Sequence, residues 1–167
     1  MRLGTILRLA LLLNVAFGSS ANAKALVRIG FCQDLKAVVA DAPNDFAKYR
    51  GHQRGATETD VTGYRTTKFT ALRHLAGAAR CSVEDHLAPD DKKPRTSYIC
   101  EWLPSGTKID AVSEVAVAAR NCVGESPDDE FTTYKDGSAV ADIYRETYSI
   151  NVSSGSVPQI FMVIRRQ

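Results

Sequence analysis

The side chains best suited to acid–base chemistry are few in this chain, which contains three histidines, His52, His74 and His86. His86 comes two residues after Glu84 and one residue after Asp85. General acid–base catalysis needs a titratable group whose pKa lies near the working pH, with a partner that polarises it. Glu84 and His86 therefore form a possible acid–base cluster. The same residues equally suit the polar end of a hairpin, and we prefer this interpretation.

Two tyrosines flank a carboxylate further along the chain. If residues 139–152 form one strand, Tyr144, Glu146 and Tyr148 lie on one of its faces, because successive side chains of a strand alternate. Tyrosines give a recognition surface large contact area with a polar tip, and a carboxylate on an aromatic face can have a shifted pKa. We predict that these residues bind a partner if they face outward. If they face inward, they are core residues, and Glu146 pairs with Arg145 or a neighbouring strand.

The single tryptophan, Trp102, is the fourth predicted binding residue. Exposed tryptophans are enriched at binding hot spots. The alternative is a core tryptophan beside a disulfide, which is the more common outcome.

Nucleophile motifs are incomplete. Residues 105–108 (SGTK) match the SxxK pattern of penicillin-binding enzymes, but the partner motifs SDN and KTG are missing, and so is GxSxG. Ser105 or Thr107 is more simply explained as a helix cap. No cysteine pair has the CxxC spacing of a zinc site, and neither Gly51 nor Gly55 follows a predicted strand as a phosphate-binding loop does. No metal or cofactor is predicted.

The first 23 residues are typical of a secretory signal peptide. Arg2 and Arg8 are basic, residues 6–17 are mostly apolar, and the small residues 21–23 (ANA) precede Lys24. The apolar run is shorter than the roughly 20 residues that span a bilayer. We expect cleavage before Lys24, a periplasmic or secreted location, and one domain over residues 24–167.

The charge of the mature chain is balanced. The full sequence has 21 basic and 19 acidic residues, and loss of Arg2 and Arg8 brings the formal charge to zero. A neutral chain offers no electrostatic argument for binding nucleic acid or an anionic membrane. No later segment resembles a membrane span. The expected partner is another envelope protein.

Four cysteines in an exported chain predict two disulfides. Cys81 and Cys100 fall in consecutive predicted strands and could face each other. Cys32 precedes the first predicted helix and Cys122 ends the second, so these ends meet if the helices lie antiparallel on the sheet. Of the three possible connectivities, we favour Cys81–Cys100 with Cys32–Cys122.

Apolar spacing predicts two helices. The first spans residues 35–49, with a kink or restart at Pro43 because proline removes a backbone donor. The second spans residues 107–123, where Thr107 and Asp110 resemble a weak capping box and Gly124 is a natural stop. Both helices have one apolar stripe, so each is expected to pack on a sheet.

Five segments have the composition or alternation of strands: residues 64–72, 78–84, 97–103, 139–152 and 159–166. Residues 51–63 and 125–138 are predicted loops. The last strand is apolar on both faces, which indicates a central position.

These elements predict an α+β fold with a mainly antiparallel sheet of four to five strands, two helices on one face and two disulfides. The order of helix, two or three strands, helix and two strands is similar to that of secretion-chaperone-like proteins. This resemblance concerns element order alone and implies no function.

The sequence therefore predicts a small exported binding module of the bacterial cell envelope, such as an adaptor, an inhibitor or a chaperone-like protein. The alternative is a small periplasmic hydrolase whose acid–base residues, Glu146 and His86 among them, are dispersed in sequence. A deep pocket with convergent titratable groups favours the enzyme, whereas a flat apolar patch on an open sheet face favours binding.

Overall fold

The computed structural model describes residues 25–104, 106–155 and 159–167. The predicted signal peptide and Ser105 lie outside them. The described chain folds into one antiparallel sheet of nine strands with two α-helices. The helices are α1 (Phe31–Val39) and α2 (Lys108–Val123), and two 3-10 helices, η1 (Ala42–Asn44) and η2 (Ala47–Tyr49), lie between α1 and the first strand. The strands are β1 (Arg50–Gln53), β2 (Glu58–Thr59), β3 (Arg65–Ala71), β4 (Arg80–Leu87), β5 (Arg95–Trp102), β6 (Glu130–Thr133), β7 (Ala139–Tyr144), β8 (Tyr148–Ser154) and β9 (Ile160–Arg166).

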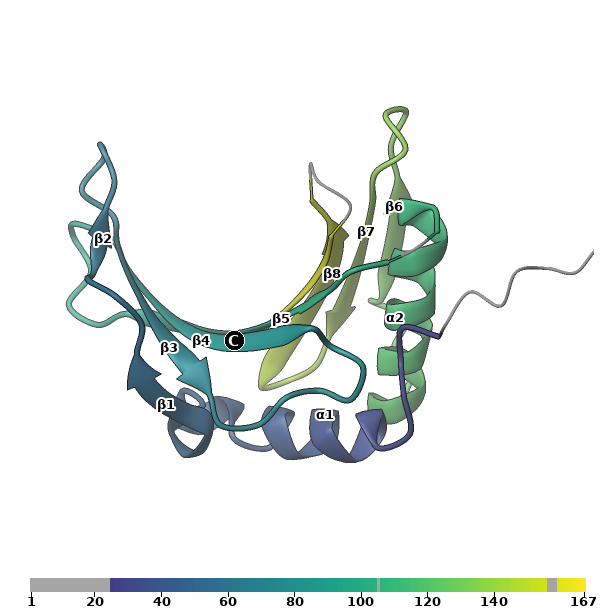
Figure 1. The fold of residues 1–167 in the computed structure, drawn as a ribbon, viewed down its shortest axis with the longest axis horizontal. Helices are drawn as coiled ribbons and strands as arrows, with labels where there is room; N and C mark the ends of the chain where they lie inside the picture. Colours follow the sequence, from purple (N-terminus) through teal and green to yellow (C-terminus); the bar gives the residue numbers. More distant parts are fainter. Residues whose placement is uncertain (1–24, 105, 156–158) are drawn as a thin grey trace, which may run out of the picture.

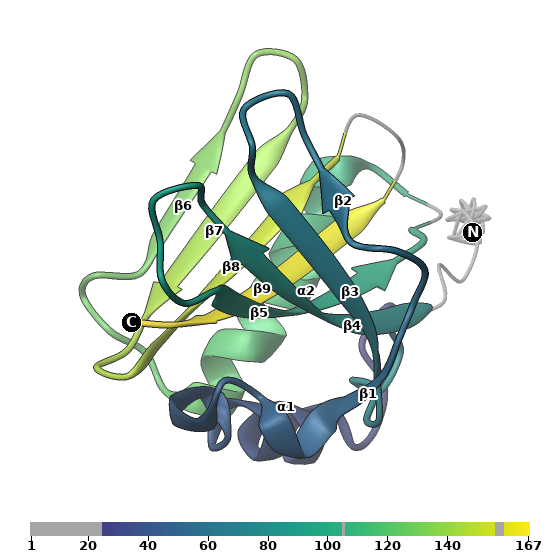
Figure 2. The same ribbon diagram turned by 90° about the vertical axis from the view of Figure 1, so that its left-hand side faces the viewer.

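The sheet is strongly curved, and both helices lie against its convex face (Figure 1). Its strand order is β1-β3-β4-β5-β9-β8-β7-β6, and β2 pairs with β3. Helix α2 packs on β7, β8 and β9 and contacts α1. Figure 2 shows β3 in front of β7, and in Figure 1 no helix or strand of the described residues lies inside the curve of the sheet. The predicted α+β fold with an antiparallel sheet and two helices is therefore confirmed, whereas the strand count was too low and the helix arrangement differs in detail.

Helix α1 is shorter than predicted. It begins after Gly30, whose φ of 96° few other residues adopt, and it buries Leu35, Val38 and Val39. Pro43 cannot supply the next helical N–H, and the chain continues as η1 and η2. The predicted kink is thus an end followed by two tight turns.

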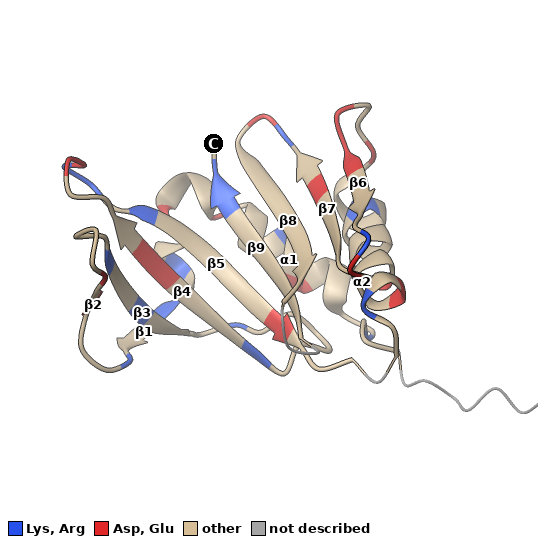
Figure 3. Ribbon diagram, turned by 90° about the horizontal axis from the view of Figure 1, so that it is seen from above, with Lys and Arg blue, Asp and Glu red and all other residues tan. Residues whose placement is uncertain are grey.

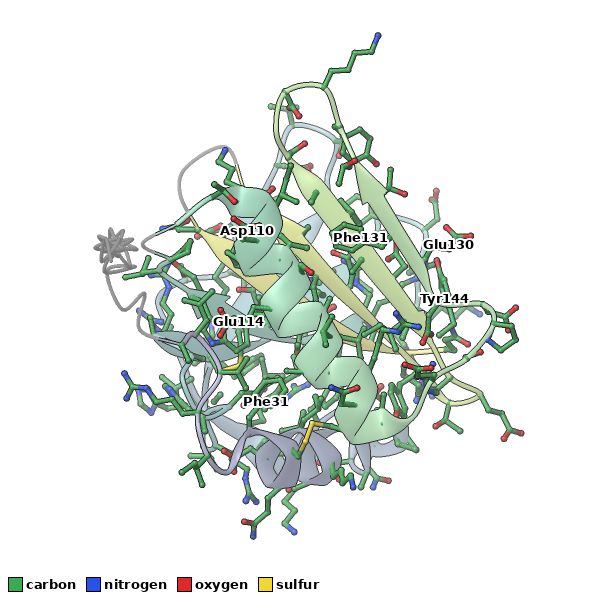
Figure 4. The ribbon with its side chains drawn as sticks, turned by 90° about the vertical axis from the view of Figure 1, so that its right-hand side faces the viewer. Phe31, Asp110, Glu114, Glu130, Phe131 and Tyr144 are labelled. Carbon is green, nitrogen blue, oxygen red and sulfur yellow. A yellow bond between two sulfur atoms is a disulfide. The ribbon has the colours of Figure 1, made fainter. Side chains whose placement is uncertain are left out.

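Helix α2 agrees with its prediction to within one residue. The Thr107 hydroxyl accepts a hydrogen bond from the Asp110 backbone N–H, which satisfies one free donor of the first turn. Figure 4 shows Asp110 in that turn and Glu114 one turn further along. The Glu114 carboxylate accepts the backbone N–H groups of Leu26 and Val27 and so holds the segment that precedes α1. Gly124, with a φ of 87°, follows the helix.

The predicted strand over residues 139–152 is wrong, because two strands, β7 and β8, occupy it. They pair antiparallel across a turn at residues 145–147, which the Arg145 N–H closes by donating to the Tyr148 carbonyl. The Arg145 side chain donates to carbonyls and to Asp129 beyond the end of α2, and these bonds fix the turn. The predicted loops also contain three short strands, β1, β2 and β6.

The last strand is central, as predicted: β9 pairs with β5 on one side and β8 on the other. Alternate residues of these strands point to the helices and form the core. On β5 they are Tyr98, Cys100 and Trp102, each no more than 1% exposed. Burial raises the pKa of the Tyr98 hydroxyl well above its usual value, and that hydroxyl donates to the Arg73 carbonyl.

Both predicted disulfides are present. Cys81 on β4 and Cys100 on β5 are direct cross-strand partners, and they are bonded to each other. Cys32 in the first turn of α1 is bonded to Cys122 in the last turn of α2. The two helices cross and do not lie antiparallel (Figure 1). The disulfide is compatible with this arrangement, because it requires only that the start of α1 lies beside the end of α2.

Candidate functional site

The concave face of the sheet carries the residues that alternate with the core. We use this name for the side chains of β3, β4, β5, β9 and β8 that point away from the helices. On the three central strands they are Ser82, Glu84 and His86 of β4, Ser97, Ile99 and Glu101 of β5, and Phe161, Val163 and Arg165 of β9. Although no helix or strand of the described ranges covers this face, Ser97 and Glu101 are only 1% and 4% exposed. Curvature of the sheet makes these side chains shield one another.

A pocket of about 430 Å³ lies on the β3–β4–β5 side of this face. Its volume is in the range of ligand sites, about 300–1,000 Å³. The apolar residues Ile99 and Phe161 line it together with charged and polar groups of both signs: Arg54, Lys68, Arg80, Ser82, Glu84 and Glu101. Such a lining suits a ligand that carries amide groups or charges.

Most charges of this pocket are already paired. Arg80 forms an ion pair with the buried carboxylate of Glu101. The Lys68 Nζ lies 3.2 Å from a carboxylate oxygen of Glu58. Arg54 differs, because its side chain makes no hydrogen bond or ion pair with any residue that the structure describes.

Thr66, His86 and Glu84 form a row on this face. His86 Nδ1 is 3.3 Å from the Thr66 Oγ1, and His86 Nε2 is 3.8 Å from the Glu84 carboxylate. Glu84 also accepts a hydrogen bond of 3.1 Å from the Ser82 hydroxyl. A hydroxyl, an imidazole and a carboxylate in this order resemble the groups of nucleophilic catalysis. Glu84 and His86 are thus close together, near the end of strand β4 in its hairpin with β5.

Asp85, the third residue of that sequence cluster, points to the opposite face. Both of its carboxylate oxygens accept hydrogen bonds of 2.8 Å from Arg50, and one also accepts from the Thr96 hydroxyl. With these bonds, Asp85 holds Arg50 and Thr96 in place on the helix side of the sheet.

The structure does not bring Tyr144, Glu146 and Tyr148 onto one face, because the strand that would align them is divided. Glu146 lies in the turn after β7 and is exposed. Tyr148 packs against the core, and burial raises the pKa of its hydroxyl. Tyr144 is 39% exposed beside Glu130 (Figure 4), and the negative charge of Asp142, together with burial and Glu130, raises its pKa.

Trp102 is a core residue, with 0% exposure. Its indole N–H donates to the Leu26 carbonyl at 3.1 Å, and its ring meets Phe31 edge-on at 6.3 Å between centroids. The surface interpretation of Trp102 is therefore wrong. Binding by Tyr144 and Glu146 stays a prediction.

The proposed partnership of Glu146 with His86 is also wrong. His86 is on β4, and two strands, β5 and β9, lie between β4 and the hairpin that carries Glu146. Their side chains cannot share one substrate atom across that width, because neighbouring strands are about 4.8 Å apart.

Sequence reasoning missed a second pocket of about 490 Å³, where β5 begins and β9 ends. Five basic residues line it with two aspartates: Lys92, Lys93, Arg95, Arg165, Arg166, Asp45 and Asp91. Figure 3 shows the blue start of β5 and the blue end of β9 at one end of the sheet, whereas β6 and β7 carry acidic segments. The doublets Lys92-Lys93 and Arg165-Arg166 were the available signal, but a net charge near zero concealed them.

Among the described residues, no group of three or more histidine, cysteine, aspartate or glutamate side chains is arranged to hold a metal ion. Within the same residues, no helix is long and apolar enough to cross a membrane. Comparisons of the chain with protein-family models, with curated proteins and with solved structures found no match. Function therefore has to be argued from the geometry.

Proposed function

We propose that this chain is a non-enzymatic binding module, and that its concave face holds an extended segment of another exported protein. The observation that supports the proposal is the difference in side chains and covering elements between the two faces of the sheet. Both helices and the apolar core occupy the convex face, and the concave face is left open with half-buried polar and charged side chains.

The lining of the concave face favours a peptide over a purely apolar ligand. Ile99 and Val163 are cross-strand partners of each other, and with Phe161 they form an apolar floor. Their other partners are polar or charged: Ser82, Asn151, Ser153 and Glu101. An extended peptide presents amide groups and side chains of mixed character, which such a surface can satisfy. A flat protein surface fits poorly into a concave face, whereas a narrow strand can enter it.

An exported location belongs to the same proposal. Two disulfides support it, because disulfides persist in oxidising compartments and are rare in the cytosol. The signal peptide with cleavage before Lys24 remains a prediction from the sequence. N-terminal sequencing of the protein recovered from the cell envelope is the direct measurement, and an intact Met1 in a cytosolic fraction would contradict it.

The binding proposal is tested by selecting short random peptides on the immobilised protein. The wild-type chain should enrich a set of peptides, and Ile99→Asp should abolish that enrichment by placing a charge on the apolar floor. Val117→Asp is the matched control, because Val117 is 49% exposed on α2 and lies outside the concave face. Both variants are first checked for an unchanged near-UV spectrum. Absence of enrichment by the wild-type chain, or equal enrichment by Ile99→Asp, would overturn the proposal.

A hydrolase is the second candidate function, and the row of Thr66, His86 and Glu84 is the observation that favours it. In this reaction the Thr66 hydroxyl attacks an ester carbonyl, His86 accepts its proton, and Glu84 stabilises the imidazolium. The ester C–O bond then breaks, and His86 returns the proton to the leaving alcohol. Water, activated by His86, hydrolyses the ester formed on Thr66 and releases the acid. The test is hydrolysis of a p-nitrophenyl ester by the wild-type chain, His86→Gln and Thr66→Val. Loss of turnover in both variants would support the enzyme, and a wild-type rate equal to that of buffer would exclude it for this ester.

A further inference from the structure

The pocket where β5 begins and β9 ends concentrates positive charge in a chain whose sequence is nearly neutral. We call the residues Lys92, Lys93, Arg95, Arg165 and Arg166 the basic end. Together with Asp45 and Asp91 they line the pocket of about 490 Å³, so five cations face two carboxylates. Three positive charges therefore remain without a counter-charge in the pocket.

The charges of the basic end are weakly engaged. Arg166 lies 3.3 Å from Asp45, and Arg95 lies 3.7 Å from Asp91, with an Arg95 side chain that is 83% exposed. The side chains of Lys92, Lys93 and Arg165 make no hydrogen bond or ion pair with any other residue of the described ranges. Exposed pairs of this kind contribute little to stability, so these cations are available to a ligand.

Register places two of the arginines on the concave face itself. Ser97 of β5 is the direct partner of Arg165 on β9, and Arg95 is two residues before Ser97 on the same side of β5. Arg95 and Arg165 are thus diagonal neighbours, about 7–8 Å apart at their backbones. Ser149 of β8 is the partner of Arg165 on its other side and adds a hydroxyl to the pocket.

This spacing matches an extended acidic peptide. Side chains at alternate positions of an extended chain lie on the same side and about 6.6–6.8 Å apart. Two carboxylates at alternate positions can therefore meet Arg95 and Arg165 together, each as a charge-assisted hydrogen bond. Single carboxylates also suit this pocket better than a dense polyanion, because Asp45 and Asp91 line the same space.

The basic end is continuous with the rest of the concave face. Ser97 has Glu84 of the first pocket as its partner on one side and Arg165 as its partner on the other. A single extended segment can therefore lie on the apolar floor and reach the basic end.

We propose that the basic end recognises the acidic part of the bound segment, through carboxylates at alternate positions of an extended peptide. This inference rests on the proposed function and gives its ligand a chemical class.

The test uses a fluorescent peptide of alternating serine and glutamate, with a serine–glutamine peptide as the neutral counterpart. Fluorescence anisotropy measures binding to the wild-type chain, to the double variant Arg95→Gln/Arg165→Gln and to Arg28→Gln. Arg28 is a matched control, because it is exposed in the segment before α1 and does not line the pocket of the basic end. Inorganic tripolyphosphate is titrated in parallel to separate carboxylate recognition from recognition of phosphate.

We expect the wild-type chain and Arg28→Gln to bind the glutamate peptide alike, and the double variant to bind it about tenfold or more weakly, as expected when charge-assisted hydrogen bonds are lost. Added salt should weaken binding, because the groups are exposed. Equal binding of the glutamine peptide, or unchanged affinity in the double variant, would overturn the inference. Binding of tripolyphosphate without the glutamate peptide would overturn it as well.

The two proposals fail in different ways. If selected peptides still require Ile99 but are indifferent to Arg95 and Arg165, the concave face binds peptides and the acidic class is wrong. If no peptide of any composition binds, the proposed function itself is wrong.

Discussion

The two faces of β5 differ in the polarity of their side chains. Tyr98, Cys100 and Trp102 point to the helices and are apolar and buried. Ser97, Ile99 and Glu101 alternate with them and point to the concave face. One strand of eight residues therefore belongs to both the core and the candidate site.

This contrast indicates where stability and recognition reside. Both helices, both disulfides and the aromatic core lie on the convex side. The concave side contributes polar and charged groups that are shielded only by curvature. Substitutions on the two sides should therefore affect different quantities. On the convex side they should lower the free energy of unfolding, and on the concave side they should change the affinity for a ligand.

The largest loss of stability should follow removal of the bond between the two helices. Cys32 and Cys122 are 90 residues apart in sequence, and Cys81 and Cys100 are 19 apart. In the chain-entropy model the first bond contributes about 4.6 kcal/mol and the second about 3.3 kcal/mol. Urea unfolding of Cys32→Ala/Cys122→Ala and of Cys81→Ala/Cys100→Ala measures both values. A larger loss from the shorter loop would show that local packing, and not loop closure, dominates.

The next effect compares aromatic residues from the two faces. Trp102→Ala should lower the free energy of unfolding by about 4 kcal/mol, because a buried aromatic side chain leaves a cavity. Phe161→Ala, from the half-buried floor of the concave face, should cost about 1 kcal/mol or less and should weaken peptide binding. Urea unfolding followed by far-UV circular dichroism measures both, since Trp102 is the only tryptophan. Equal losses would mean that Phe161 is part of the core.

The convex face is the part of the molecule that the sequence could predict. Apolar residues at helical spacing marked α2, alternation marked the buried side of β4 and β5, and apolar residues on both faces marked β9 as central. The positions of the cysteines relative to these elements then favoured one of the three possible pairings, and the structure has that pairing. Each of these signals comes from burial, which constrains residue type strongly.

The edges of the sheet and the concave face carried weaker signals. Strands β1, β2 and β6 are short and largely exposed, so their composition resembles that of loops. The turn at residues 145–147 contains no glycine or proline, because side-chain bonds from Arg145 fix it. A tertiary contact of this kind has no local pattern in the sequence.

The basic end was concealed for a related reason. Lys92 and Lys93 lie in a loop, and Arg165 comes more than sixty residues after Arg95 in the sequence, so only strand register brings them together. The net charge of the chain does not reveal such a cluster, because acidic residues elsewhere balance it. The polar face of a strand also accepts many residue types, and the residues that matter there cannot be separated from ordinary solvated ones.

A smaller loss of stability than that of Trp102→Ala is expected at a polar group on the covered side, Asp129, whose side chain is 1% exposed. Its carboxylate lies 2.7 Å from Arg145 and 3.3 Å from Arg120. Burial alone would raise the pKa of Asp129, but hydrogen bonds from Arg145 and from the backbone N–H groups of Ser126 and Tyr144 more than offset it, and the pKa is lowered. The charged form is therefore favoured in the folded state.

Because the folded pKa lies below the unfolded value of about 3.9, this carboxylate stabilises the fold fully above that pH, and the contribution is lost as pH falls through the folded pKa. Asp129→Asn should cost roughly 2 kcal/mol at pH 7, since it leaves Arg145 without its charged partner. The difference from the wild-type chain should narrow below about pH 4. Asp136→Asn is the matched control: the pKa of Asp136 is also lowered, by the Ser138 hydroxyl and N–H, but in an exposed turn, so its loss should be small by comparison. Urea unfolding from pH 7 to pH 3 separates the two variants. Equal losses would mean that a polar anchor on the convex side is no more important than a turn in solvent, and the contrast between the faces would then rest on apolar burial alone.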